Sequence, residues 1–396
     1  MHKLEGSASA AGQRAGRFAL WNLGFRPFYL LASIYAACSV VLWALEYAGY
    51  LPTGYLRNPL WHGHEMLFGY TIAVVAGFLF TAVRNWTQRP TPTGLALAAY
   101  ALLWLAGRVL VLAPYPMVAA VVNAAFPVAV AAGIGLPLVR AGNRRNYFFI
   151  VLLVAVGMAE LAFQLSQMGL LQWPGQVSLQ LGLDIVLFII AVVAGRVIPM
   201  FTNNALPGAR ATRSPWVERL ALGGVLALIV ADLLALPSVL IAVLAVAVAV
   251  VHAVRLYLWQ PWRTLATPLL WVLHGAYAWI VIHLLLRALA ALSWIAEPFA
   301  VHALTIGAIG GMTIGMMTRT ARGHTGRPLV ADPYEVSCYV LIQLAALIRV
   351  FGGMLLPAIY LWTVVGSALC WSTAFGIYAI RYWPILSRPR PDGRPG

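Results

Sequence analysis

The sequence predicts an all-α membrane protein, a polytopic bundle of about twelve transmembrane helices. The 396 residues are 62% hydrophobic and only 9% charged, with a mean hydropathy of +0.84. A water-soluble interior cannot bury that much apolar surface. The apolar residues form unbroken runs of about twenty, the length that crosses a hydrocarbon layer of ~30 Å. Because the runs are continuous rather than alternating, they indicate helices and not a barrel.

Short segments rich in proline, glycine and arginine separate the apolar runs, and no soluble insert interrupts them. In chain order, the expected spans are 28–48, 62–84, 93–113, 115–139, 147–169, 176–200, 216–235, 237–258, 267–290, 298–318, 334–355 and 357–382. We therefore expect one integral membrane domain over 1–396, with a cytoplasmic segment at 1–27 and a cytoplasmic tail at 383–396.

Basic residues gather in every second connection between the expected spans. They comprise Lys3, Arg14, Arg17 and Arg26, then Arg84 and Arg89, and further groups within 140–145, 196–219, 255–263, 319–327 and 381–394. By the positive-inside rule, this pattern predicts cytoplasmic termini and an even number of spans. The net charge of +15 is then an orientation signal. Basic and aromatic residues do not interleave outside the membrane, which argues against nucleic-acid binding.

Histidines lie inside or beside the apolar spans, where polar side chains usually mark function. A rise of 1.5 Å per residue puts His302, His283 and His64 at similar depths near the outer face, where they could converge. The same arithmetic puts His274 and His252 about 20 Å from that face. His274 and His283 project from opposite sides of one helix, so they cannot bind the same metal.

The segment Trp61-His62-Gly63-His64-Glu65-Met66 opens the second span. Histidines two positions apart on a helix point about 200° away from each other. Both therefore serve one site only if His62 lies in a turn before the helix. Imidazole suits haem iron, copper and zinc, and Glu65 could orient a ligand or relay a proton. The alternative is a pair of hydrated histidines at the mouth of the helix.

Charged residues also fall at the outer level of the predicted bundle. Four basic residues are not explained by the cytoplasmic side: Arg57, Arg108, Arg287 and Arg349. They require anionic partners, and the acids Glu160 and Asp184 reach a comparable depth. One interpretation is a set of ion pairs that fix helix orientation, with these acids also able to carry protons. The other is a pair of haem propionates held by arginine.

The tenth expected span carries Gly307, Gly311 and Gly315 at intervals of four. These glycines clear one helix face for a neighbouring helix or for a flat macrocycle. Met312, Met316 and Met317 are either core filler or soft copper ligands. The loop that follows places His324 among arginines, where it either fixes topology or docks an anionic headgroup or phosphate. Arg196 and Asn203, beside Pro199, suggest no chemistry.

Several short motifs, in this order and spacing, resemble the NnrS family. They are Phe25-Arg26-Pro27-Phe28, Trp61-His62-Gly63-His64-Glu65-Met66-Leu67-Phe68-Gly69, Ala76-Gly77-Phe78-Leu79, Leu273-His274-Gly275-Ala276-Tyr277-Ala278-Trp279, His302-Ala303-Leu304-Thr305 and Gly323-His324-Thr325-Gly326-Arg327-Pro328. The resemblance implies a bacterial inner-membrane protein with haem, expected to be b-type, and copper. It also implies a link to the response to nitric oxide and to denitrification.

The resemblance favours His62, His64, His274 and His302 as metal ligands, with His324 as a further motif residue. His283 enters the candidate set only through its depth, and His252 has no motif support. Arg84 departs from the pattern, since related sequences often have proline there; the departure puts no ligand in doubt.

The first functional hypothesis is a haem–copper membrane protein that binds nitric oxide and removes or reduces it. Reduction consumes protons, for which Glu65, Glu160 and Asp184 are the expected carriers, while Arg108 and Arg349 would contact the cofactor. Electrons would come from quinol or from a separate donor protein. Two alternatives remain open: a transporter or chaperone for metal or haem, and a haem-based sensor of nitric oxide without turnover.

Overall fold

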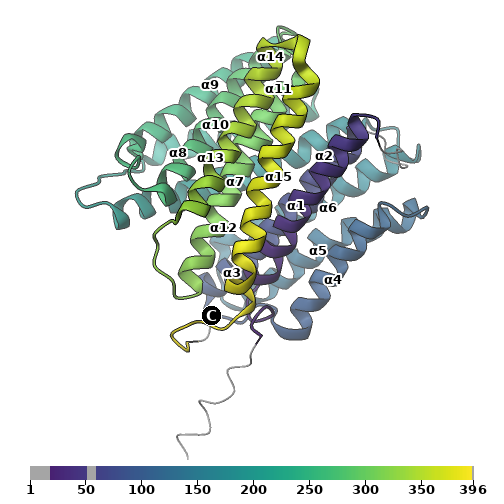
Figure 1. Cartoon of the computed structure of the whole chain (residues 1–396). Helices are drawn as coiled ribbons and strands as arrows, with labels where there is room; N and C mark the ends of the chain where they lie inside the picture. The colour runs from purple at the N-terminus through teal and green to yellow at the C-terminus, as the bar shows by residue number, and fades with distance from the viewer. Residues whose placement is uncertain (1–17, 51–58, 395–396) are drawn as a thin grey trace, which may run out of the picture.

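The computed structural model describes residues 18–50 and 59–394. Throughout these two ranges the regular structure is helical (Figure 1), which confirms the predicted all-α fold. Arg57 and most of the expected cytoplasmic segment at 1–27 lie outside the described residues. The other predicted site residues all lie within them.

Ten helices of the described chain are long and apolar enough to cross a membrane, so the protein is a multi-pass membrane protein. Some of these helices combine several consecutive segments. The ten are α1 (Phe25–Tyr47), α2–η1–α3 (Leu60–Thr87), α5 (Pro116–Arg140), η2–α6 (Arg144–Gln167), α7 (Gly175–Ala205), α9 (Ser238–Leu258), α10 (Pro268–Ala291), α11–η4–α12 (Glu297–His324), α13–η5–α14 (Pro333–Leu355) and η6–α15 (Pro357–Ser387).

Two further helices occupy the positions of the other expected spans. α4 (Gly94–Leu110) has 17 residues, which at 1.5 Å per residue gives a length of about 26 Å. α8 (Pro215–Leu233) carries Glu218 and Arg219 near its start and Asp232 near its end. Neither meets the length and apolarity of the other ten. A count of twelve membrane crossings therefore stays a prediction.

The two ends of the described chain lie together at one end of the bundle (Figure 1). The backbone N–H of Ala19 donates to the carbonyl of Ser387 at 2.7 Å. Arg26 ties the same elements together, because its Nη1 donates to the carbonyls of Leu386 at 2.8 Å and Arg388 at 3.0 Å. An even number of membrane crossings places both ends of a chain on the same side, and this is the arrangement observed. Their cytoplasmic orientation stays a prediction.

Three of the long helices contain π-helical turns that the sequence analysis did not anticipate. They are η1 (Glu65–Thr71) between α2 (Leu60–His64) and α3 (Ile72–Thr87), η4 (Ala303–Gly310) between α11 (Glu297–His302) and α12 (Gly311–His324), and η5 (Ile348–Gly352) between α13 (Pro333–Leu347) and α14 (Gly353–Leu355). A π turn adds a residue to the helical turn and rotates the side chains that follow. Such turns are frequent at functional sites.

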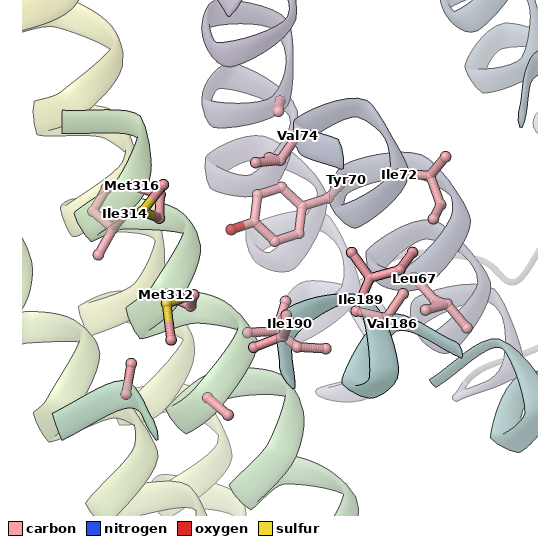
Figure 2. Close-up of a cluster of buried hydrophobic side chains, with 14 of the residues drawn as sticks. Leu67, Tyr70, Ile72, Val74, Val186, Ile189, Ile190, Met312, Ile314 and Met316 are labelled. Atoms are coloured by element: carbon pink, nitrogen blue, oxygen red, sulfur yellow. The ribbon is translucent and has the colours of Figure 1, made fainter. Parts of the chain in front are cut away.

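An apolar cluster fills the middle of the bundle, where η1 and α3 approach α7 and α12 (Figure 2). Its labelled members are Leu67, Tyr70, Ile72, Val74, Val186, Ile189, Ile190, Met312, Ile314 and Met316. All are buried. Met312 and Met316 therefore lie among hydrocarbon side chains, which supports their interpretation as core filler rather than as copper ligands.

The spaced glycines of η4 and α12 pack against α10. A Cβ at Gly311 would lie 2.8 Å from the Cβ of Ala276, and a Cβ at Gly315 would lie 2.8 Å from a methyl group of Leu273. A Cβ at Gly307 would overlap the ring of Trp279. Close helix approach thus accounts for all three glycines.

Candidate functional site

A cavity of about 270 Å³ opens at the end of the bundle away from the chain termini. Its walls come from α1, α2, η1, α7, α11, η4, η5 and α15, so all three π turns contribute. Most of the lining is apolar. The polar and aromatic side chains relevant to its chemistry are His62, Tyr70, Gln180, Glu297, His302, Arg349 and Trp371. Leu67 and Tyr70 also belong to the apolar cluster of Figure 2, which therefore lies against this cavity.

His302 is the last residue of α11 and lines the cavity. Its Nδ1 lies 2.6 Å from the carbonyl oxygen of Pro298, one turn earlier. A carbonyl only accepts, so Nδ1 carries the proton and Nε2 carries the lone pair. A backbone carbonyl that fixes the tautomer in this way is the usual second partner of a metal-bound histidine.

His62 reaches the same cavity from α2. Its ring stacks on Trp43 of α1, with the ring centroids 4.2 Å apart and the planes inclined by 23°. The Nδ1 atom of His62 is buried and has no hydrogen-bond partner among the described residues. His62 and His302 also interact electrostatically with each other and with Arg349. Two imidazoles and one guanidinium are thus brought together from three separate helices.

Arg349 lies on η5 and is buried. Its Nη2 donates to the hydroxyl of Tyr360 at 2.9 Å, and the guanidinium lies 5.0 Å from the centre of that ring. Its Nη1 is buried and has no hydrogen-bond partner in the part of the chain that the structure describes. No carboxylate of the described residues lies within 4.0 Å of it. Arg349 is therefore a cavity-lining cation that makes no close ion pair with a described carboxylate, although Glu297 also lines the cavity.

His64 follows His62 by two residues but belongs to a different group of side chains. Its Nδ1 donates to Glu65 Oε1 at 2.6 Å, and its Nε2 accepts from the amide of Gln164 at 2.9 Å. Glu160 Oε1 lies 3.4 Å from Nε2. Arg108 donates to Glu65 Oε2 at 2.6 Å. Both ring nitrogens of His64 thus have protein partners, and the ring does not line the cavity.

This buried network is extended by Tyr35 of α1 and Asn123 of α5. Tyr35 donates to Glu65, and Asn123 accepts from Arg108. The expectation that Arg108 needs an anionic partner is confirmed, although its close partner is Glu65 and Glu160 is 4.0 Å away. Within the structure, Arg108 contacts an ion-pair network and not the cavity.

A second ion-pair group touches the cavity wall. Arg287 of α10 donates to Asp184 Oδ1 of α7 at 2.8 Å and also pairs with Asp232 of α8. Gln180, which lines the cavity, donates to Asp184 Oδ1 at 3.1 Å. The other carboxylate oxygen of Asp184 is buried and has no partner among the described residues. Asp184 thus pairs with an arginine, in agreement with the ion-pair interpretation, and Gln180 links it to the cavity.

The remaining histidines of α10 do not line the cavity. His274 donates from Nδ1 to the carbonyl of Leu270 at 3.1 Å, and its Nε2 lies 3.4 Å from Thr202 Oγ1. His283 donates from Nδ1 to the carbonyl of Ala300 at 2.8 Å. His283 thus packs against the backbone of α11 at Ala300, two residues before His302 in the sequence.

The structure therefore differs from the convergence that helix depth suggested for His64, His283 and His302. His302 meets His62 instead. Depth along a helix axis fixes one coordinate only, and the rotation of each helix decides which neighbour a side chain faces. His252 likewise lies apart, with its Nδ1 2.6 Å from the hydroxyl of Tyr277.

Residues 18–50 and 59–394 contain no group of three or more histidine, cysteine or acidic side chains placed to hold one metal ion. In the cavity, His62 and His302 form a pair of imidazoles with the Arg349 guanidinium beside them, and the lining also includes the carboxylate of Glu297. Trp43, Gln180 and Tyr360 contact the residues of the site and were not predicted from the sequence. Their aromatic and amide side chains, set in apolar helices, are the one feature of the sequence that could have identified them as site residues. Such side chains are common in membrane helices, so this feature is not specific.

A model of a known protein family matches this chain. The model described as NnrS protein covers residues 19–390. Among curated proteins, no sequence matches the chain. The family match extends from the segment before α1 to the tail after α15, and it includes the cavity and both ion-pair networks. The chain therefore belongs to the NnrS family and is a multi-pass membrane protein related to the nitric oxide response.

Proposed function

We propose that this protein binds a haem in the cavity of His62, His302 and Arg349 and uses it to bind nitric oxide and remove it by reduction. The setting would be the bacterial inner membrane during nitrosative stress and denitrification. One observation carries the proposal: two imidazoles and a guanidinium with no described carboxylate within 4.0 Å share a largely apolar cavity. Family membership supports the connection to nitric oxide.

The donor set suits a haem. His302 is held by the Pro298 carbonyl so that Nε2 is available to a metal, and His62 has a buried ring nitrogen without a partner. Arg349 would hold a propionate, because guanidinium pairs with carboxylate through two parallel hydrogen bonds. When bound, haem supplies an iron atom that coordinates nitric oxide. The apolar wall around it excludes water.

The described residues do not fit a copper centre built from three or more imidazoles. Outside the cavity, His64 and His274 have protein partners at both ring nitrogens. We therefore derive no step through copper.

A proton supply is the second requirement of reduction. Asp184 is the buried acid joined to the cavity wall, through Gln180. Arg287 connects Asp184 to Asp232, whose side chain is 22% exposed at the end of α8. This order of groups supports a role for Asp184 in holding a proton near the cavity. Glu65 and Glu160 lie in the separate network around His64. Electrons would come from quinol or a separate donor protein.

An optical spectrum of the purified full-length protein, reduced and then exposed to nitric oxide, tests this function. We expect about one haem per chain, a Soret band that shifts on addition of nitric oxide, and reoxidation as nitric oxide is consumed. A shift of the Soret band without reoxidation of the haem would contradict enzymatic reduction of nitric oxide and would support a sensor. A preparation that stays colourless after haem is supplied would contradict the cofactor itself and would favour a transport function.

A further inference from the structure

A second cavity, of about 490 Å³, lies at the end of the bundle that carries the chain termini. It is separate from the cavity of His62 and His302, with no lining residue in common. Five segments meet around it: the stretch before α1, the end of α3, the start of α4, the end of α12 and the tail after α15. Its polar lining consists of Asn22, Arg84, Asn85, Thr93, His324 and Arg390.

Positive charge exceeds negative charge around this cavity. Arg390 donates to Asp392 at 2.6 Å and to the carbonyl of His324 at 3.1 Å. The hydrogen bond from Arg390 holds the pKa of Asp392 below its ordinary value, so that carboxylate stays ionised. Arg84 is exposed in the cavity wall and has no carboxylate within 4.0 Å among the described residues.

Arg26 adds a buried charge beside the cavity. It interacts electrostatically with Arg390 and with Arg327, and neither Arg26 nor Arg327 pairs with a described carboxylate. The side chain of Arg26 is fully buried, and its Nε and Nη2 atoms have no hydrogen-bond partner in the described chain. A buried guanidinium without a counter-ion is costly. A nearby anion would reduce that cost.

The start of α4 contributes a further attraction for anions. Thr93 and Gly94 line the cavity, and the Thr93 side chain makes no capping hydrogen bond to the helix. The N–H of Gly94 donates to the carbonyl of Trp21 at 2.8 Å, and the N–H groups that follow it receive no acceptor from the Thr93 side chain. A helix N-terminus with free N–H groups and the positive end of its dipole favours phosphate or carboxylate.

We infer that this basic cavity, lined by Arg84, His324 and Arg390, binds a phosphate group. Guanidinium groups bind phosphate oxygens in a bidentate manner, and the amide and hydroxyl side chains of the lining supply further donors. The phosphate belongs either to an anionic lipid headgroup or to a small soluble molecule. A lipid headgroup can reach the site because Arg84 lies near the end of the membrane-spanning helix Leu60–Thr87. The inference does not depend on haem binding.

The matched pair Arg84→Gln and Arg89→Gln tests the site. Both arginines are exposed near the end of the same helix, but only Arg84 lines the cavity. Full-length protein in detergent is titrated with phosphatidylglycerol, with phosphatidylcholine and, separately, with inorganic phosphate, and the bound ligand is counted by native mass spectrometry. Removal of one charged hydrogen-bond donor should weaken binding about tenfold. We expect this loss in Arg84→Gln and unchanged binding in Arg89→Gln.

The three titrations distinguish the source of the phosphate. Preference for phosphatidylglycerol that inorganic phosphate does not compete away supports a lipid headgroup. Competition by inorganic phosphate supports a soluble ligand. Equal binding in wild type and Arg84→Gln would overturn the site, as would equal retention of phosphatidylcholine and phosphatidylglycerol with no binding of inorganic phosphate. Because Arg84 makes no ion pair with a described residue, the variant should keep the wild-type thermal midpoint, and an unchanged midpoint shows that a loss of binding is local.

Discussion

His62 and His64 are separated by one residue of α2, yet their rings belong to different environments. His62 stacks on Trp43 and lines the cavity, while His64 is held between Glu65 and Gln164 in a buried ion-pair network. Both lie on regular helix, where positions two apart point about 200° away from each other. The two histidines are therefore neighbours in the sequence but point into different environments. His62 shares its site with His302, which lies on α11, far from α2 in the sequence.

Arg349 should control cofactor affinity and not the stability of the bundle. Replacement of Arg349 by Gln removes the cation without breaking a carboxylate pair, since none of the described carboxylates lies within 4.0 Å. Loss of a charge-assisted hydrogen bond to a propionate should weaken haem binding about tenfold or more. Haem titration of the apoprotein measures this change. Arg349→Lys, which keeps the charge, should recover part of the affinity; equal affinity in all three proteins would contradict the assignment.

The pair of Arg108 and Glu65 should be one of the strongest local determinants of stability. Arg108→Met leaves the buried Glu65 carboxylate without its cation, which should lower the free energy of unfolding by about 3–5 kcal/mol. Denaturant unfolding in detergent measures the loss. The matched control is Arg213→Gln, whose pair with Glu218 is partly exposed and should contribute about 0–1 kcal/mol. Similar losses in the two variants would show that the network around His64 is not the buried unit described.

Gly307 of η4 should not accept a larger residue without a loss of stability, because η4 packs closely against α10 at this residue. A methyl group at Gly307 would overlap the Trp279 ring, and overpacking of this kind costs about 1–3 kcal/mol. Gly275→Ala on α10 is the control, because nothing lies within 4 Å of its added Cβ. Thermal unfolding should show a lowered midpoint for Gly307→Ala and an unchanged or raised midpoint for Gly275→Ala. An unchanged midpoint for Gly307→Ala would contradict the close packing of η4 on α10.

The helices themselves were predictable because long apolar runs fix where a chain enters and leaves hydrocarbon. The expected span 237–258 matches α9 (Ser238–Leu258), and 267–290 matches α10 (Pro268–Ala291). The three π turns were not predictable, because they depend on how backbone hydrogen bonds shift under packing, and no residue pattern specifies that shift. The shortfall of α8 arises from Glu218, Arg219 and Asp232, charges that a search for apolar runs passes over.

Some residues of the cavity were predictable from the sequence, but their arrangement was predictable only in part. The sequence identified both cavity histidines and the need of the outer arginines for anions, and the structure gives Arg108 and Arg287 their carboxylates. The sequence could not show that, among the outer arginines that the structure describes, Arg349 lines the cavity without a carboxylate within 4.0 Å, nor that His302 shares this cavity with His62. The rotation of each helix decides which side chains face the cavity, and the tautomer of each histidine decides which ring nitrogen can bind a ligand. Both depend on tertiary and backbone contacts, such as that of His302 with the Pro298 carbonyl.

Haem content of two single variants tests the central claim most directly. His302→Ala removes a cavity imidazole whose ring makes one backbone hydrogen bond, whereas His64→Gln alters a histidine outside the cavity and keeps a hydrogen-bonding side chain in the network. The account predicts that purified His302→Ala loses its haem or shows a changed Soret band, while His64→Gln keeps the wild-type haem-to-protein ratio and spectrum. Loss of haem in His64→Gln together with an unchanged spectrum in His302→Ala would contradict the account.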